Sequence, residues 1–222
     1  MKPDIISDII PNLISGEECA AASGQTFDKL SPHNGQKLCQ VVRSNQEDVK
    51  KAIQAARLAH PAWAATTPVM RGDILHDITL GMRKNREELA GIVAAETGMS
   101  VSAALGEVGG AIAQGEFMAG EGRRFYGRTT TSAVPNKYNM TIRQPLGVAG
   151  LIIAANTPIA NVAWKVFPAL LCGNGAVLKA AEDTPATAWY FGKIAQEAGL
   201  PPGVLNIIQG YGKEAGEPLV AD

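Results

Sequence analysis

The sequence is poor in the residues from which structural metal sites and disulfide frameworks are built. Its 222 residues include 3 cysteines and 3 histidines. The cysteines show no C-x-x-C spacing, and no histidine lies near a cysteine in the sequence; the residues concerned are Cys19, Cys39, Cys172, His33, His60 and His76. An odd number of widely separated cysteines is not the pattern of a zinc site or of a set of disulfides. We therefore expect neither.

An excess of one charge and a long hydrophobic run are also missing. Lys and Arg total 20 against 21 Asp and Glu, so no strong field would attract a nucleic acid or an anionic membrane. Residues 1–4 lead into no apolar stretch of signal-peptide length, and no run approaches the roughly 20 residues that cross a bilayer. We expect a cytoplasmic protein with a small-molecule ligand, and neither a nucleic-acid nor a membrane partner.

The sequence does contain a regular alternation of apolar and polar segments in residues 147–222. Residues 147–155 are apolar at nearly every position, which is typical of a strand buried in the interior of a parallel sheet. Pro158 suits the first position of a helix, with Thr157 as its cap and Asn156 left at the carboxyl end of the strand. Strands at 176–179 and 204–209, with a helix between them, continue the pattern. It predicts an α/β fold whose ligands bind at that edge.

The first 127 residues predict a hairpin followed by helices. Turn formers within 12–42, with Asn34-Gly35 as the strongest hairpin signal, indicate two antiparallel strands. Ser44 and Glu47 form a candidate capping box for a helix that ends at His60-Pro61. Further helices are expected at 68–84, 86–96 and 101–126; the last is rich in Ala and Gly and is predicted to be buried and tightly packed.

Residues 128–145 predict a two-stranded arm outside the main sheet. Thr129–Ser132 and the alternating Tyr138–Ile142 flank the turn formers Pro135-Asn136. A lone pair of strands is only marginally stable, so we expect the arm to contact another surface.

Many short motifs, in order along nearly the whole chain, resemble the aldehyde dehydrogenase superfamily in the amino-terminal half of its coenzyme-binding domain. The most specific are Pro145-Leu146-Gly147-Val148, Asn156-Thr157-Pro158, Phe167-Pro168-Ala169-Leu170, Val177-Leu178-Lys179, Pro202-Gly203-Val204 and Gly210-Tyr211-Gly212. The resemblance implies a Rossmann-like domain in three parts. Residues 1–127 would hold its first hairpin and helices, 128–145 an arm for oligomerisation into a homodimer or tetramer, and 146–222 its first βαβαβ part.

The resemblance also implies that this chain is a fragment. In the family, the glycine-rich phosphate-contacting segment, the general-base glutamate and the nucleophilic cysteine come later in the chain, with the catalytic domain. None of the three cysteines here matches the nucleophile. We therefore expect residues 1–222 to lack turnover on their own.

The resemblance assigns Asn156 to the oxyanion hole, where its amide would donate to the oxygen that becomes negative as a thiolate adds to an aldehyde. The residues alone allow another interpretation, in which Asn156 merely helps to cap the following helix.

Four residues are assigned by the resemblance to coenzyme binding: Ile153, Lys179, Glu182 and Gly212. An acidic Glu182 on the ribose would disfavour a 2′-phosphate, so NAD is expected, with NADP as the alternative. The residues alone leave other interpretations open: Lys179 as a solvated charge, Glu182 as a charge favoured by a helix dipole, and Gly212 as a turn glycine with positive φ.

Thr157, Asn161 and Trp164 lie at i, i+4 and i+7 and would share one helix face, which the family uses to line its substrate tunnel. Many members have tryptophan at the position of Ala155 and a large aromatic residue at that of Thr157. The smaller, more polar residues here predict a substrate that is polar or bulky near its carbonyl, not a long alkyl aldehyde.

The resemblance therefore implies NAD(P)-dependent oxidation of an aldehyde to a carboxylic acid through a cysteine thiohemiacetal. Two other functions remain open on the sequence. One is a non-catalytic module that binds a nucleotide or another subunit; the other is a related reductase acting on acyl phosphates, which fits Asn156 and Lys179 less well.

Overall fold

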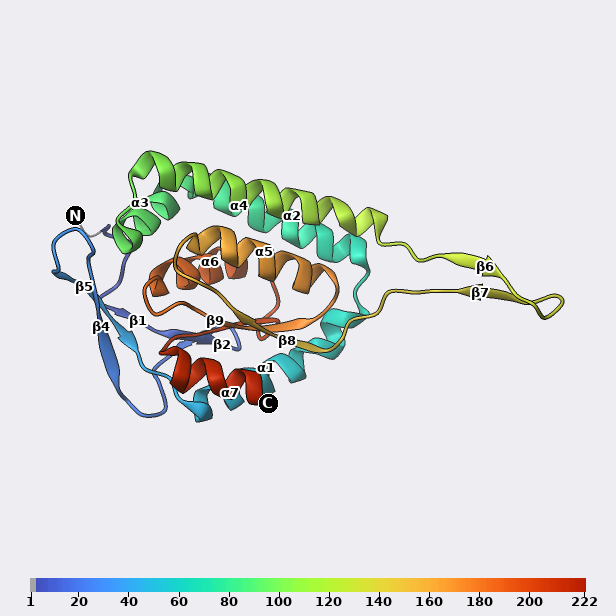
Figure 1. Ribbon diagram of the computed structural model, residues 1–222, viewed down its shortest axis with the longest axis horizontal. Helices are drawn as coiled ribbons and strands as arrows, with labels where there is room; N and C mark the ends of the chain where they lie inside the picture. Colours follow the sequence, from blue (N-terminus) through green and yellow to red (C-terminus); the bar gives the residue numbers. More distant parts are fainter. Residues whose placement is uncertain (1–2) are drawn as a thin grey trace.

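The computed structural model describes residues 3–222 as an α/β protein built around one five-stranded sheet (Figure 1). The strands lie in the order β3-β2-β10-β9-β8. Their bounds are Asn12–Ile14 (β2), Glu17–Cys19 (β3), Val148–Ile152 (β8), Gly175–Lys179 (β9) and Leu205–Ile208 (β10). β8, β9 and β10 are parallel neighbours, whereas β2 is antiparallel to both β10 and β3. The predicted series of strand, helix, strand, helix and strand is confirmed.

Helices cover both faces of the sheet. α5 (Pro158–Leu171) and α6 (Pro185–Glu197) lie on one face, and α1 (Gln46–Ala65) and the short α7 (Glu217–Ala221) lie on the other (Figure 1). A π-helical turn, η2 (Gly212–Gly216), leads into α7. This layered arrangement buries the apolar residues of β9 and β10 on both faces.

A further layer of helices packs on α5 and α6. It consists of α2 (Pro68–Lys84), α3 (Arg86–Thr97) and α4 (Val101–Glu121), followed by a short turn, η1 (Gly122–Arg124). A Cβ on Gly115 of α4 would lie 2.4 Å from Thr79 and 2.6 Å from Phe167, so this glycine permits close packing. Cβ atoms on Gly106, Gly109 and Gly110 would meet open space. The prediction of a tightly packed α4 is therefore right for one face only.

β8 differs from its prediction as a strand of the sheet interior. It has a partner strand, β9, on one side only within the described residues, and Gly150 and Ile152 are exposed. An edge strand and a central strand differ in whether one or both sides pair with a neighbouring strand, and both can be apolar. The apolar composition of β8 alone could therefore not show which of the two it is.

The first helix begins and ends at different residues from those predicted. Asn45, not Ser44, is the N-cap: its side chain accepts from Glu47 N, while Asp48 accepts from Asn45 N. At the other end α1 continues through Pro61 to Ala65. Trp63 explains the extension, because it is buried and its Nε1 donates to Leu170 O at 3.1 Å.

The predicted hairpin is present as β4 (Thr26–Leu30) and β5 (Lys37–Val42), which are antiparallel. β1 (Ile9–Ile10) pairs with β5 in parallel. The sequence reasoning missed the second hairpin, β2 with β3, which turns at Ser15 and Gly16 with φ values of 55° and 83° and extends the main sheet.

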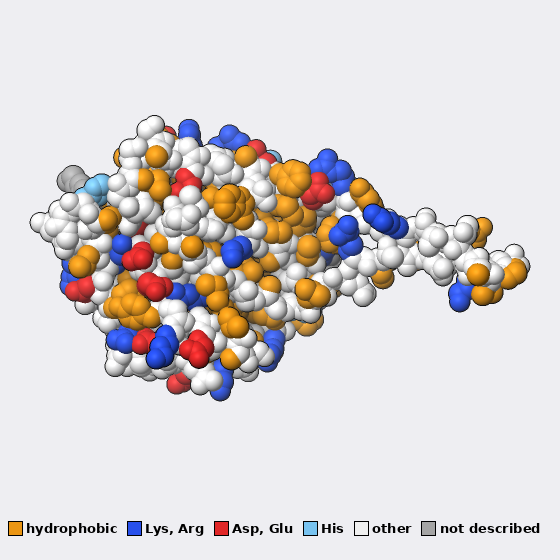
Figure 2. All heavy atoms as spheres, in the orientation of Figure 1, with side chains coloured by type: hydrophobic (Ala, Val, Ile, Leu, Met, Phe, Trp, Pro, Cys, Tyr) orange, Lys and Arg blue, Asp and Glu red, His pale blue; other side chains and the backbone are white. Residues whose placement is uncertain are grey.

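The predicted arm is a separate two-stranded sheet of β6 (Thr129–Thr131) and β7 (Tyr138–Met140), and it projects from the body (Figure 1). Figure 2 shows hydrophobic side chains at its tip. The exposed large apolar side chains of the arm and its flank are Val134, Tyr138, Met140 and Ile142.

Among residues 3–222, no cluster of three or more His, Cys, Asp or Glu side chains could hold a metal ion. In the same part of the chain no single helix has the length and hydropathy to cross a membrane; Arg86–Thr97 and Val101–Arg124 meet that criterion only as a pair bent by 120°.

Candidate functional site

The carboxyl ends of β8, β9 and β10 meet at one edge of the sheet, which is where open parallel sheets bind ligands. Two backbone hydrogen bonds join the segments that leave these strands: Ile153 N donates to Lys179 O at 3.4 Å, and Ala180 N donates to Ile208 O at 3.0 Å. The residues predicted from the sequence to form a site therefore emerge from neighbouring strands along a single edge.

Lys179 ends β9 with a side chain that is only 3% exposed, and its Nζ donates to Glu182 Oε2 at 2.6 Å. Burial opposes ionisation of Glu182, but the hydrogen bond and charge of Lys179, with smaller effects from the backbone amides of Glu182 itself and of Gly212, outweigh it, and the pKa of Glu182 lies below its usual value. Lys179 is therefore not a solvated charge. Three of the four predicted coenzyme residues lie together.

Gly212 is exposed and begins η2. Its φ is not positive, so the alternative of a turn glycine does not hold; Gly210, with φ of 124°, fills that role. A Cβ at Gly212 would have nothing within 4 Å. The backbone here is open to close approach by a ligand.

Ile153, the fourth predicted coenzyme residue, follows β8 and is 5% exposed. Its side chain is part of the hydrophobic core. Any contact of Ile153 with a ligand at this edge would therefore be made through its backbone.

Asn156 is exposed at the start of α5, near Thr157 and Asn161. Asn161 Nδ2 lies 3.3 Å from Asn156 Oδ1 and 3.2 Å from Thr157 Oγ1. Because Asn156 Oδ1 accepts this bond, its Nδ2 is the group left to donate, and it has no partner among residues 3–222. Trp164, on the next turn of α5, is 55% exposed.

Asn156 does not cap α5. Thr157 holds the N-cap position as predicted, although its side chain accepts no capping bond. The capping bonds are accepted instead by Glu107 of α4, whose Oε1 accepts from Ile159 N at 2.9 Å and from Ala160 N at 3.1 Å. Burial raises the pKa of Glu107, against the effect of these two bonds.

Glu96 of α3 caps α6 in the same way. Its carboxylate accepts from Ala186 N at 2.8 Å, from Thr187 N at 2.9 Å and from Thr187 Oγ1 at 2.7 Å. Complete burial raises the pKa of Glu96 to about 7, although these bonds and the charge of Lys29 favour its ionised form. Both helix N-termini at this edge are thus satisfied by protein carboxylates and offer no free anion site.

A pocket of about 360 Å³ opens beside Asn156, and its nine lining residues are Lys29, Pro32, Glu96, Thr97, Met99, Ala155, Asn156, Asp183 and Thr184. Thr184 Oγ1 is buried without a hydrogen-bond partner in the described part of the chain. The pocket has both polar and apolar lining residues, and it adjoins Asn156, which the resemblance assigns to the oxyanion hole.

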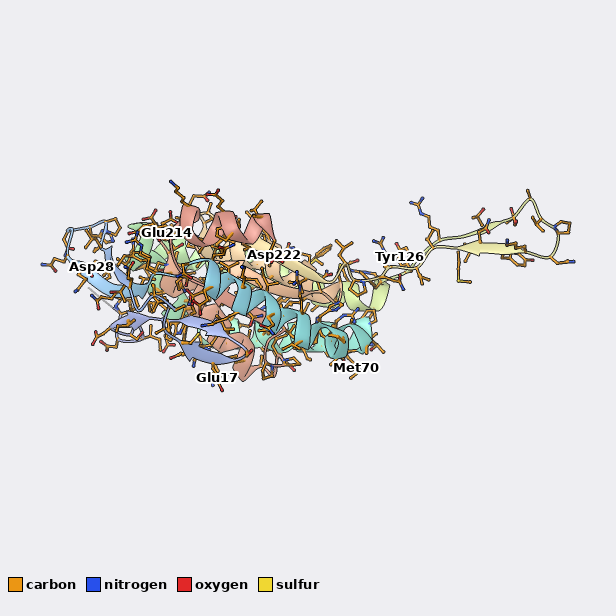
Figure 3. The ribbon with its side chains drawn as sticks, turned by 90° about the horizontal axis from the view of Figure 1, so that it is seen from below. Glu17, Asp28, Met70, Tyr126, Glu214 and Asp222 are labelled. Carbon is orange, nitrogen blue, oxygen red and sulfur yellow. The ribbon has the colours of Figure 1, made fainter. Side chains whose placement is uncertain are left out.

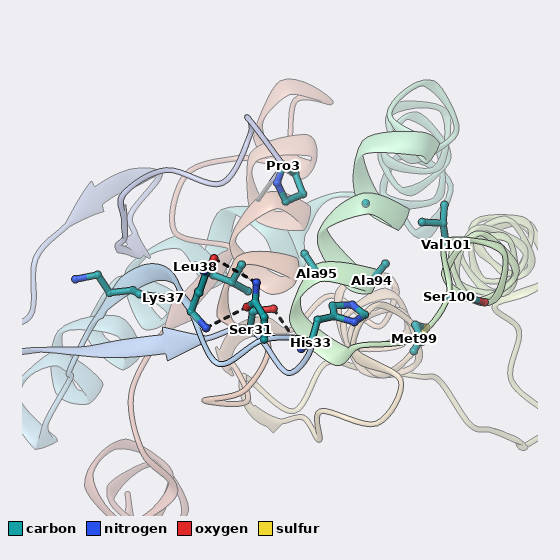
Figure 4. A pocket seen from close by; sticks show the side chains of 13 residues that line it. Pro3, Ser31, His33, Lys37, Leu38, Ala94, Ala95, Met99, Ser100 and Val101 are labelled. Carbon is teal, nitrogen blue, oxygen red and sulfur yellow. Dashed lines mark hydrogen bonds between the residues drawn. The ribbon is translucent and has the colours of Figure 1, made fainter. Parts of the chain in front are cut away.

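A second pocket, of about 500 Å³, lies between the β4–β5 turn and the α3–α4 junction (Figure 4). Ser31, His33, Lys37 and Met99 are among its lining side chains. Ser31 Oγ is engaged within the turn, where it accepts from His33 N at 3.3 Å. No residue of the predicted site lines this pocket, so the strand ends remain the candidate site.

Comparison with known proteins identifies the family. A model described as the aldehyde dehydrogenase family matches residues 19–222. The chain belongs to the aldehyde dehydrogenase family. It is 40% identical over 212 residues to the mitochondrial aldehyde dehydrogenase family 2 member B4 of Arabidopsis thaliana. The matched region covers 94% of this chain and 39% of that protein. The chain thus spans about two-fifths of the length of this relative.

Solved structures agree with this assignment to the aldehyde dehydrogenases. An NADP-dependent enzyme of E. coli superposes with a TM-score of 0.94 at 35% identity, over 96% of this chain and 44% of that one. An indole-3-acetaldehyde dehydrogenase of P. syringae, solved with NAD+ and IAA, superposes with a TM-score of 0.94 at 32% identity, over 98% and 44%. The described chain therefore has the aldehyde dehydrogenase fold over nearly its whole length.

The sequence reasoning missed the two glutamates that support this aldehyde dehydrogenase edge. Glu107 is an isolated carboxylate in an Ala- and Gly-rich helix, and Glu96 ends a buried helix. An acidic residue on an otherwise apolar helix face is a signal that could have indicated a buried partner, but it could not name the backbone amides of α5 and α6.

Proposed function

We propose that this chain is the coenzyme-binding, oxyanion-stabilising part of an NAD(P)-dependent aldehyde dehydrogenase that oxidises an aldehyde to a carboxylic acid. Membership of the family supports the reaction class. The observation that carries the proposal is the cluster of Lys179, Glu182 and Gly212 at the sheet edge, with open space over Gly212.

This cluster fits the adenosine part of a dinucleotide. The Glu182 carboxylate can accept from ribose hydroxyls, and the buried Lys179 ammonium can donate to them. The ionised Glu182 would repel a 2′-phosphate, although its ion pair with Lys179 offsets part of that charge. NAD is therefore the proposed coenzyme, and NADP is the alternative, in keeping with the E. coli enzyme described as NADP dependent.

In the proposed reaction a cysteine thiolate adds to the aldehyde carbon, and the electron pair of the carbonyl moves to its oxygen. Asn156 Nδ2 donates a hydrogen bond to that oxygen as it becomes negative. NAD held by Lys179, Glu182 and Gly212 would supply the hydride acceptor for oxidation of this carbon to a thioester, which water would hydrolyse to the acid and the free thiol. None of Cys19, Cys39 and Cys172 matches the family nucleophile, so residues 1–222 alone are proposed to be inactive.

The substrate is proposed to be polar or bulky near its carbonyl. Ala155 and Thr157 are small, and Thr157 and Asn161 present polar atoms on the same face of α5 as the exposed Trp164. A long alkyl chain would cover these polar groups and offer them no hydrogen bond beyond those they make with each other and with Asn156.

The arm is proposed to join subunits into a homodimer or tetramer, because its apolar side chains are exposed on a thin two-stranded sheet. The alternative, a non-catalytic binding module, draws its support from the same arm.

The test is NAD(P)H formation, followed at 340 nm with the full-length protein and a panel of short polar, bulky and long alkyl aldehydes. The proposal expects aldehyde-dependent signal, faster with NAD than with NADP and slowest with long alkyl aldehydes, and none from residues 1–222 alone. Coenzyme binding without turnover of any aldehyde would favour the non-catalytic module.

A further inference from the structure

The segment that carries Gly212 is fastened to the junction between β5 and α1. Gly210 packs so closely on this junction that a Cβ there would lie 3.1 Å from Ser44 N. Asn12 Oδ1 accepts both from Gln209 N at 2.8 Å and from Ser44 Oγ at 2.9 Å. These three polar groups are buried, so the start of the segment is fixed by bonds that water does not replace.

Arg43 fastens the far end of the same segment. Its Nε donates to Glu214 Oε2 at 2.7 Å, and a terminal nitrogen donates to Glu214 Oε1, so the guanidinium and the carboxylate form a two-bond fork. This fork holds the pKa of Glu214 below its usual value. Figure 3 shows Glu214 at the same end of the molecule as Asp28, opposite Tyr126 at the base of the arm.

Tyr211 adds an aromatic contact beneath the guanidinium. The Arg43 Cζ lies 5.2 Å from the centre of the Tyr211 ring, and the Phe27 ring lies 4.6 Å from it on the hairpin side. Cation–π attraction and ring packing therefore act on the residue directly before Gly212, while the ion pair acts two residues after it.

Gly212 is thus held from two directions. On one side lies Glu182, whose pKa is lowered in part by the backbone amide of Gly212 and which is paired with Lys179 of β9. On the other side Arg43, which follows β5, holds Tyr211 before Gly212 and Glu214 two residues after it. Between these holds the backbone follows a π-helical turn, a widened geometry that is common at functional sites and needs support from its surroundings.

We propose that Arg43 is a positioning residue that sets coenzyme affinity by holding the Gly212 segment in its binding conformation through Glu214 and Tyr211. This rests on the proposed function, in which Gly212 meets the adenosine part of NAD. Arg43 itself does not touch the coenzyme or the reacting atoms. A segment that is already ordered loses less conformational entropy when the ligand binds, so releasing it weakens binding and leaves the chemical step alone.

The test measures NAD affinity of the full-length protein by isothermal titration calorimetry, together with kcat and the KM for NAD. Arg43→Ala is expected to weaken NAD binding by roughly tenfold, with kcat at saturating NAD unchanged, because only pre-organisation is lost. Glu214→Gln should act in the same direction, and the double variant should add little to either. The exchange of charges, Arg43→Glu with Glu214→Arg, should recover part of the affinity.

Arg83→Ala is the control, since Arg83 makes an ion pair with Glu116 between α2 and α4 that is more exposed than the Arg43–Glu214 pair. It should leave NAD affinity unchanged. Should Arg43→Ala not fold, Arg43→Lys, which keeps one donor and the charge, and Glu214→Gln carry the test.

Unchanged NAD affinity in Arg43→Ala would overturn the inference and leave the proposed function standing. If Arg43→Ala does not fold, unchanged affinity in both single variants, Glu214→Gln and Arg43→Lys, would do the same. A loss in Arg43→Ala that Glu214→Gln does not share would also overturn it, because Arg43 would then act on the coenzyme directly. A wild-type protein that binds neither NAD nor NADP would remove both proposals.

Discussion

At the scale of single residues, the hydrogen-bond partners of each site side chain determine which of its donors and acceptors remain available to a ligand. Asn156 accepts from Asn161 through its oxygen, so only its Nδ2 is left to donate. Lys179 is almost completely buried yet pairs with Glu182 at the surface. Both arrangements present hydrogen-bonding groups to the sheet edge without the reorganisation that a flexible surface side chain would need.

Asn156→Ala removes the proposed oxyanion donor. We expect kcat of the full-length enzyme to fall by about 10² to 10³, with little change in NAD affinity, since loss of one such donor typically costs that much and the coenzyme residues are elsewhere. Steady-state kinetics and NAD titration measure the two effects. Asn34→Ala, in the exposed β4–β5 turn, is the control. Wild-type kcat in Asn156→Ala would mean that another group stabilises the oxygen.

The positions of these site residues at the ends of the strands could be predicted from the sequence, but not all of the partners that surround them. The capping alternative for Asn156 could be rejected only once Glu107, far away in the sequence, was seen on the amides of α5. Likewise, the turn alternative for Gly212 failed because Gly210 has the positive φ. Both answers depend on tertiary contacts or backbone angles that local sequence does not specify.

At the scale of elements, two helices of the outer layer supply the caps of the two helices that leave the sheet edge. Glu107 from α4 caps α5, and Glu96 from α3 caps α6. The outer layer therefore does more than cover apolar surface. It fixes the start of α5, which follows Asn156, and the start of α6, which follows Glu182.

Glu96→Gln tests the electrostatic side of this arrangement. Because folding raises the pKa of Glu96 from 4.5 to about 7, its contribution to stability is fully present below about pH 4.5 and is lost as the pH rises through 7. We expect the free energy of unfolding, from urea titrations between pH 4.5 and 8, to depend less on pH in Glu96→Gln than in the wild type. Glu87→Gln, exposed on the same helix, should leave the pH profile unaltered. Identical slopes for Glu96→Gln and the wild type would contradict the account.

Most elements could be predicted from periodicity and caps, and the failures have identifiable causes. Pro61 is a sound stop signal in isolation, but the buried Trp63 extends α1 past it. The apolar composition of β8 predicted a central strand, although its place at the edge is fixed by pairing, which the composition of one strand does not reveal. The β2–β3 hairpin was missed because its strands have only three residues each.

At the scale of the whole molecule, the body is a layered α/β unit and the arm is the one sheet of the described chain that projects away from it (Figure 1). Its apolar side chains have no cover among residues 3–222. An exposed surface of this kind is expected to be buried against another subunit.

If the arm joins subunits as proposed, replacing Tyr138, Met140 and Ile142 together by Ser should reduce the proposed oligomer to smaller species, because the apolar area available for the contact is lost. Size-exclusion chromatography with light scattering on the full-length protein measures the mass. Val220→Ser, at a similarly exposed apolar side chain of α7, is the control. An unchanged mass in the triple variant would place the subunit contact elsewhere.

The carboxyl edge of the sheet is proposed to bind the adenosine part of NAD over Gly212. The most direct measurement is the NAD dissociation constant of full-length Gly212→Val, beside Gly109→Val, whose added side chain also meets open space but lies on α4. NAD binding is expected to be at least tenfold weaker in Gly212→Val, because the added side chain fills the space above the backbone, and unchanged in Gly109→Val. Wild-type affinity in Gly212→Val would contradict this proposal.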